Sequence, residues 1–176
     1  MRRKALLAVG LFGGLAWAGE PSTSTEDSVT PFNAVYTVLQ SPRCLNGHPA
    51  GDVPLQRDSG ELHAMEVSRH SADVGLPCTT CHRPIGIDLP HLPPANPGWR
   101  LPPANQAFQG RSPRELCLQL QGAATLDPAA FLHHVRDDSL VAWGWSPGAG
   151  RTVPPLTHPE FVAVVSAWIA GGTACP

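Results

Sequence analysis

Two cysteines and a histidine near the middle of the chain have a spacing that suits covalent attachment of a metalloporphyrin. They lie in the segment Cys78-Thr79-Thr80-Cys81-His82. Thiols separated by two residues can form thioethers with the two vinyl groups of a haem, and the adjacent histidine can then supply an axial imidazole to the iron. The segment therefore predicts haem c held by Cys78, Cys81 and His82.

Two other interpretations of these cysteines stay open. A dithiol of the thioredoxin type also has this spacing, but it belongs to a βαβ pattern that the sequence does not show. A structural Zn²⁺ is the stronger alternative, because four residues of the chain form a ligand set that suits tetrahedral zinc: Cys44, His48, Cys78 and Cys81. Zinc would make the chain an exported, zinc-stabilised binding module.

A second segment, Cys44-Leu45-Asn46-Gly47-His48, has the haem pattern with glycine in place of the second cysteine. Cys44 can still form one thioether, and His48 keeps the spacing of an axial ligand, which would give a second haem. The alternative is a vestigial site in which Cys44 stays free and His48 is a loop residue. The sequence thus predicts one haem, with a second left open.

The sixth ligand of the iron must come from a short set of residues. Met65 is the one methionine besides Met1, so a His/Met haem requires it. His63 and His91 are the alternatives, and His63 would share a face with Met65 in an extended segment. An open sixth position would instead favour a haem sensor or haem enzyme.

Two cysteines remain after this assignment, Cys117 and Cys175, and they are the natural disulfide pair. The loop that they close would stabilise the fold by about 3–4 kcal/mol in the chain-entropy treatment. Cys44 could replace either partner.

The N-terminus predicts export to the periplasm. A basic start at residues 2–4 precedes an apolar run at 5–18, which ends in Ala16-Trp17-Ala18. This pattern is typical of a cleaved signal peptide at 1–18, and the run is too short to span a bilayer. A flexible lead-in at 19–29 and a single domain at 30–176 would follow.

The charge balance argues against nucleic acid as a partner. Removing Arg2, Arg3 and Lys4 from the 12 basic residues leaves 9, against 14 acidic residues. A nucleic-acid-binding surface needs a basic footprint. We expect redox partner proteins whose contact surface is basic or apolar. No nucleophilic triad, phosphate loop or carboxylate pair indicates an enzyme, so an electron carrier is expected.

The composition predicts a mainly α fold with few or no strands. The 176 residues include 20 Pro and 17 Gly, which break long helices and sheets. Helix starts are expected at Thr30-Pro31, at a capping box in 112–115, at Asp127-Pro128 and at Thr157. The second helix should stop at Gly122. Residues 46–110 form loop in this interpretation, which suits a compact domain if a cofactor fills its centre.

Most of the chain resembles a family of small exported c-type cytochromes that are associated with isoquinoline 1-oxidoreductase, a molybdenum hydroxylase. The resemblance rests on Ser41–Asp52, His63-Ala64-Met65, Cys78–His82, Glu115-Leu116-Cys117, Leu140–Gly148 and Ala174-Cys175-Pro176. It implies a cytochrome c-like fold of short helices around haem and a two-haem electron carrier that serves such a hydroxylase. The chain departs from the family pattern at Gly47, where the family has cysteine, and at Arg100, where it has histidine.

Overall fold

The computed structural model describes residues 25–83, 94–96 and 98–176. The expected signal peptide at 1–18 and the candidate ligand His91 lie outside these residues. The described part is mainly helical, as predicted. Its α-helices are α1 (Thr25–Leu39), α2 (Pro42–Leu45), α3 (Pro113–Leu126), α4 (Pro128–Asp137), α5 (Ser139–Trp143) and α6 (His158–Ala170).

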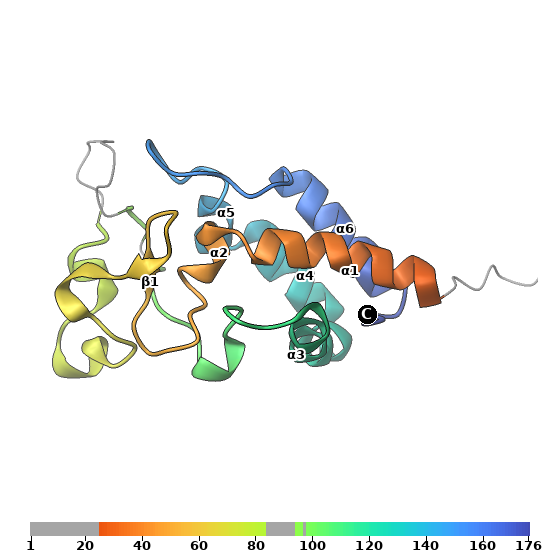
Figure 1. The fold of residues 1–176 in the computed structure, drawn as a ribbon, viewed down its shortest axis with the longest axis horizontal. Coiled ribbons are helices and arrows are strands. Elements are labelled where there is room, and N and C mark those ends of the chain that lie inside the picture. Colours follow the sequence, from red (N-terminus) through yellow and green to blue (C-terminus); the bar gives the residue numbers. More distant parts are fainter. Residues whose placement is uncertain (1–24, 84–93, 97) are drawn as a thin grey trace, which may run out of the picture.

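The core forms where α6 packs against α1 and α4, and α3 packs against the same two helices; Figure 1 shows α1 and α6 side by side. The apolar face predicted for α1 is buried here, with Phe32 and Val38 fully inaccessible. The ring of Phe32 lies 5.1 Å from that of Trp168 on α6. Burial of such large apolar side chains is the main favourable contribution to folding.

Local capping starts three of the helices at the predicted residues. Ser112 and Glu115 form a capping box at α3, and Thr157 and Glu160 form another at α6. Asp127 accepts a hydrogen bond from the backbone of Ala130 and caps α4. Each side-chain oxygen satisfies an N–H group that the first turn of a helix leaves unpaired.

The predicted start of α1 at Thr30 is wrong, because the helix begins at Thr25 and continues through Pro31. Residues 25–29, expected as part of a flexible lead-in, are therefore helical. Proline lacks one N–H and clashes with the carbonyl four residues earlier. This energetic cost is confined to the first part of the helix, because only residues 25–30, fewer than two turns, precede Pro31.

The predicted stop at Gly122 is also wrong, since α3 continues to Leu126. An internal glycine costs a helix about 1 kcal/mol relative to alanine. Tertiary contacts on both sides of it offset this cost. Ala124 is fully buried, and the side chain of Gln121 donates to the carbonyl of Thr173 at 2.9 Å.

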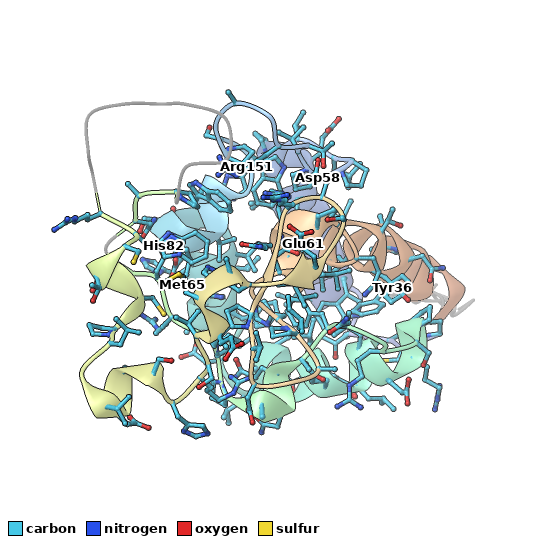
Figure 2. The ribbon with its side chains drawn as sticks, turned by 60° about the vertical axis from the view of Figure 1, so that its left-hand side comes forward. Tyr36, Asp58, Glu61, Met65, His82 and Arg151 are labelled. Atoms are coloured by element: carbon cyan, nitrogen blue, oxygen red, sulfur yellow. A yellow bond between two sulfur atoms is a disulfide. The ribbon has the colours of Figure 1, made fainter. Side chains whose placement is uncertain are left out.

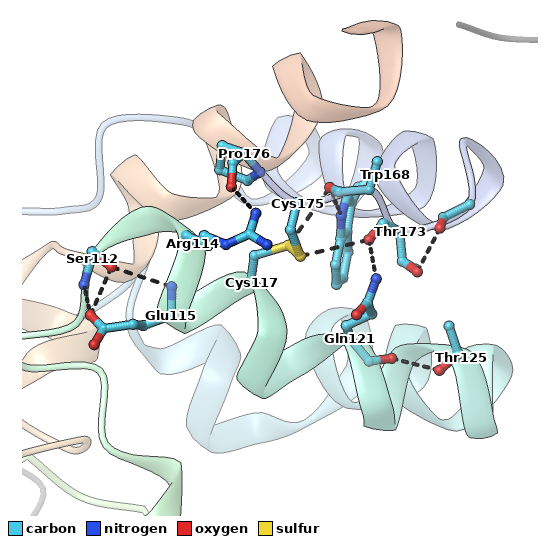
Figure 3. Close-up of a disulfide and its surroundings, with 12 residues drawn as sticks. Ser112, Arg114, Glu115, Cys117, Gln121, Thr125, Trp168, Thr173, Cys175 and Pro176 are labelled. Carbon is cyan, nitrogen blue, oxygen red and sulfur yellow. Dashed lines mark hydrogen bonds between the residues drawn. A yellow bond between two sulfur atoms is a disulfide. The ribbon is translucent and has the colours of Figure 1, made fainter. Parts of the chain in front are cut away.

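The C-terminal tail is fastened to α3 by a disulfide between Cys117 and Cys175, whose Cα atoms lie 5.6 Å apart (Figure 3). Arg114 donates to the carbonyl of Pro176 at 2.8 Å, and the indole N–H of Trp168 donates to the carbonyl of Ala174 at 3.0 Å. The pairing is the one that the cysteine count favoured.

The chain between α2 and α3 contains little regular structure, and Figure 1 shows its first half, in yellow, beyond one end of the helices. Strands β1 (Leu55–Gln56) and β2 (Glu61–Leu62) pair in antiparallel fashion. Four single-turn 3₁₀ helices follow: η1 (Ala64–Glu66), η2 (Ser71–Val74), η3 (Cys78–Thr80) and η4 (Ala104–Gln106). Across the described ranges, no helix is long and apolar enough to cross a bilayer.

Candidate functional site

The segment Cys78–His82 folds into one compact helical turn. The backbone N–H groups of Cys81 and His82 both donate to the carbonyl of Cys78, at 3.2 and 3.0 Å. In such a turn, side chains three and four residues apart lie on the same side. The two thiols and the imidazole therefore project together, and neither cysteine forms a disulfide.

A backbone carbonyl holds one ring nitrogen of His82. Its Nδ1 lies 2.9 Å from the carbonyl oxygen of Pro94, and the ring is partly buried. Burial is the main cause that lowers the pKa of His82, so the imidazole is neutral at pH 7. A neutral ring that donates from Nδ1 keeps the lone pair of Nε2 for a metal.

Trp99 supports both partners of this hydrogen bond. Its ring centroid lies 4.7 Å from that of His82, and its indole N–H donates to the same Pro94 carbonyl at 2.7 Å. Behind it, Trp143 of α5 packs edge-on at 5.1 Å. The axial imidazole therefore has a rigid aromatic backing, which orients a ligand before any metal arrives.

An ion pair between a buried arginine and an exposed aspartate lies next to Trp143. The guanidinium of Arg43 lies 6.0 Å from the Trp143 ring and pairs with Asp58. Asp58 also accepts a hydrogen bond from the backbone of Thr152 at 3.0 Å. Burial lowers the pKa of Arg43, although a guanidinium stays charged at any ordinary pH. The ion pair joins α2 to the turn after β1, and the hydrogen bond from Thr152 joins that turn to the loop after α5.

No motif in the sequence assigns a role to Arg43, Asp58 or Trp99. In the sequence, Arg43 and Asp58 are 15 residues apart, and Trp99 is far along the chain from both. No spacing rule connects them, because their proximity comes from the packing of separate loops.

Two candidate sixth ligands lie at the same end of the molecule as His82, and Figure 2 shows Met65 there. The ring of His63 lies 6.0 Å from that of His82. Met65 is 83 % exposed and has a left-handed backbone, with φ of 68°. The prediction that His63 and Met65 share a face is wrong, because residues 64–66 form a 3₁₀ turn rather than an extended segment.

The degenerate segment Cys44–His48 folds into the same turn as Cys78–His82. Here Gly47 and His48 donate to the carbonyl of Cys44, again at 3.2 and 3.0 Å. Cys44, however, packs against the core, and its sulfur accepts a hydrogen bond from the Ser41 hydroxyl. Burial raises the pKa of Cys44 to about 11, which keeps it a neutral and unreactive thiol.

The imidazole of His48 also contacts other residues closely. It stacks on Phe108 with ring centroids 3.7 Å apart, and its Nδ1 lies 2.8 Å from the carbonyl oxygen of Gln106. Burial lowers the pKa of His48 to about 4. One face of the ring is thus covered by another ring, and the turn serves packing.

The structure does not assemble the zinc ligands of the alternative interpretation. In the part of the chain that is described, no three side chains of His, Cys, Asp or Glu are grouped as metal ligands. Cys44 and His48 face the helical core, while Cys78 and Cys81 belong to the loop end.

The residues that the structure does bring together define a candidate attachment site for haem c: two free thiols and one oriented imidazole on a single turn. Comparisons with protein families, with curated proteins and with solved structures find no match for this chain. The functional assignment therefore depends on the chemistry of these residues.

Proposed function

We propose that this protein is an exported c-type cytochrome that carries single electrons through one haem bound at Cys78, Cys81 and His82. The observation that carries the proposal is the Cys78–His82 turn itself. It presents both thiols unoxidised, together with an imidazole whose Nδ1 is fixed by the Pro94 carbonyl. Thioether attachment needs the first feature and axial ligation needs the second.

The surroundings of the turn also suit a large apolar group. Four large hydrophobic side chains in the adjoining segment are strongly exposed: Leu62, Met65, Val74 and Leu76. Large apolar side chains that are exposed to water are costly, and exposed apolar surface often marks a binding site. A haem attached at Cys78 and Cys81 has two apolar faces that would cover part of this surface.

The bound haem would supply a one-electron couple, and the chain would set its potential. The hydrogen bond from His82 to Pro94 increases the basicity of the axial imidazole, and the Trp99 ring limits its rotation. The Arg43–Asp58 pair lies behind Trp143, and Arg151 adds a positive charge that acts on His82.

The second turn supports a single haem. Cys44 is a half-buried thiol whose raised pKa keeps it neutral, so this turn offers no reactive thiolate for a thioether, and the His48 ring is stacked on Phe108. The Cys44–His48 segment is best explained as a site that has become part of the core.

Export to the periplasm and an electron-transfer partner complete the proposal. The chain after residue 18 has 9 arginines and 14 acidic residues and contains no lysine. Its partner should therefore offer a basic or apolar surface. A molybdenum hydroxylase is the partner class that the family resemblance favours.

Replacement of both attachment cysteines tests this function. The protein, produced with a haem-maturation system, should retain haem on a denaturing gel and show a reversible one-electron reduction. Cys78→Ala/Cys81→Ala should lose all covalent haem, whereas the matched control Cys44→Ala should keep it. Haem retained in the double variant would contradict the proposed site.

A further inference from the structure

We infer that His63 is the sixth ligand of the iron, so that the haem is held between the imidazoles of His63 and His82. This inference rests on the proposed function and specifies the coordination at the same site. Its basis is the separation of the two rings, whose centroids lie 6.0 Å apart and whose planes are inclined by 49°.

This separation is the one that a metal between two imidazoles requires. A first-row metal lies about 2 Å from an imidazole nitrogen, and that nitrogen lies about 1.1 Å from the ring centre, so two opposite ligands place their ring centres about 6 Å apart. The inclination of the planes presents no obstacle, because each ring can rotate about its own metal–nitrogen bond. The distance between the ring centres of His63 and His82 therefore fits two ligands of one iron.

The hydrogen bonds of the two rings match this role. Nδ1 of His63 lies 2.5 Å from the carbonyl oxygen of Ala64, and Nδ1 of His82 lies 2.9 Å from that of Pro94. A backbone carbonyl can only accept, so each ring donates from Nδ1. In each case Nε2 is the nitrogen left with a lone pair, and among the described residues it has no hydrogen-bond partner.

The backbone conformation changes directly after His63. Met65 and Glu66 both have left-handed backbone conformations, with φ of 68° and 52°. Such a conformation is uncommon for residues other than glycine. His63 is the candidate ligand whose ring is partly buried, with its centroid 6.0 Å from that of His82.

Coordination by two histidines has spectroscopic consequences. Both oxidised and reduced protein should be low-spin and six-coordinate, without a sulfur–iron charge-transfer band at the red end of the oxidised spectrum. The reduction potential should be lower than that of a His/Met haem on the same protein, because a thioether ligand raises it. Carbon monoxide should leave the reduced spectrum of the native protein unchanged.

Four single variants of the haem-loaded full chain test the inference by absorption, electron paramagnetic resonance and redox titration. His63→Ala should lose the six-coordinate low-spin signal and bind carbon monoxide, while His63→Met should gain the sulfur–iron band and a higher potential. Met65→Leu should match the native protein. His70→Ala is the control, because His70 is an exposed histidine of the same loop that pairs with Asp73.

Each other result overturns the inference. A native sulfur–iron band that disappears in Met65→Leu would assign Met65. An unchanged spectrum in His63→Ala would exclude His63, and loss of the signal in a fifth variant, His91→Ala, would then identify the ligand. Carbon monoxide binding by the native protein would show an open position. All of these results presuppose covalent haem, whereas its absence would instead contradict the proposed function.

Discussion

The imidazole of His48 lies flat against the phenyl ring of Phe108, with ring centroids 3.7 Å apart and planes 3° apart. The two residues are also joined through their backbones, since the Phe108 N–H donates to the His48 carbonyl at 2.9 Å. The loop before α3 is thus anchored on the Cys44–His48 turn. Under the proposed function, this contact favours the use of the Cys78–His82 turn alone.

The haem count is the first prediction. Intact mass of the mature protein should show one haem per chain, and iron analysis should give one iron. Cys44→Ala should change neither value, because the Cys44 thiol is buried and neutral. Two haem masses, with the second lost in Cys44→Ala, would show that the Cys44–His48 turn opens during maturation.

The stability of the fold should depend on pH through His48. Its pKa is about 4 in the folded protein and about 6.5 when unfolded, so acidification protonates the unfolded state first. The stabilisation that the neutral His48 provides is fully present above about pH 6.5. It is lost as the pH falls toward 4, by up to about 3 kcal/mol. Urea unfolding across this range should show the decline.

His48→Gln should flatten the profile between pH 4 and 6.5 relative to the native protein. His70→Gln is the matched control, since this histidine lies on the surface and should leave the profile unchanged. A native slope that survives in His48→Gln would assign the pH dependence to other groups.

Loss of Asp58 should destabilise the fold by roughly 2–3 kcal/mol, because it leaves a charged guanidinium buried without its partner. The Arg43 side chain is 2 % exposed, while Asp58 is 36 % exposed. The backbone N–H of Thr152 also loses its acceptor. Chemical denaturation of Asp58→Ala measures the effect.

A surface pair provides the control for that measurement. Asp137 contacts Arg136 at 2.8 Å, but both side chains are well exposed. Asp137→Ala should therefore lower the free energy of unfolding much less than Asp58→Ala does. If Asp58→Ala and Asp137→Ala lowered the free energy of unfolding equally, the burial of Arg43 would add nothing to the stabilisation by the Arg43–Asp58 pair.

The disulfide should contribute about 3–4 kcal/mol, because it links residues 58 positions apart and restricts the unfolded chain. Cys117→Ser/Cys175→Ser should lower the free energy of unfolding by this amount. Arg114→Ala, which removes a hydrogen bond of the same tail, should cost about 1 kcal/mol. Non-reducing peptide mapping should recover the Cys117 and Cys175 peptides linked, and a link to Cys44 would contradict the assignment.

Sequence alone determined the features that depend on residues within one turn of each other. The start of α3 follows from Ser112 and Glu115, and that of α6 from Thr157 and Glu160, since a capping box is complete within four residues. The Cys78–His82 turn is local in the same sense, because its thiols and imidazole are brought together by backbone bonds inside five residues.

Tertiary structure decided everything that depends on contacts between distant segments. The spacing of His63 and Met65 suggested a shared face, but the left-handed turn at Met65 separates them and the fold places His63 beside His82. Cys44 and Cys78 begin similar turns and are both half-buried, yet Cys44 packs against the helical core and Cys78 lies in a loop. Such differences come from the packing of whole elements, in which burial energy outweighs local preference, and no short sequence pattern encodes that competition.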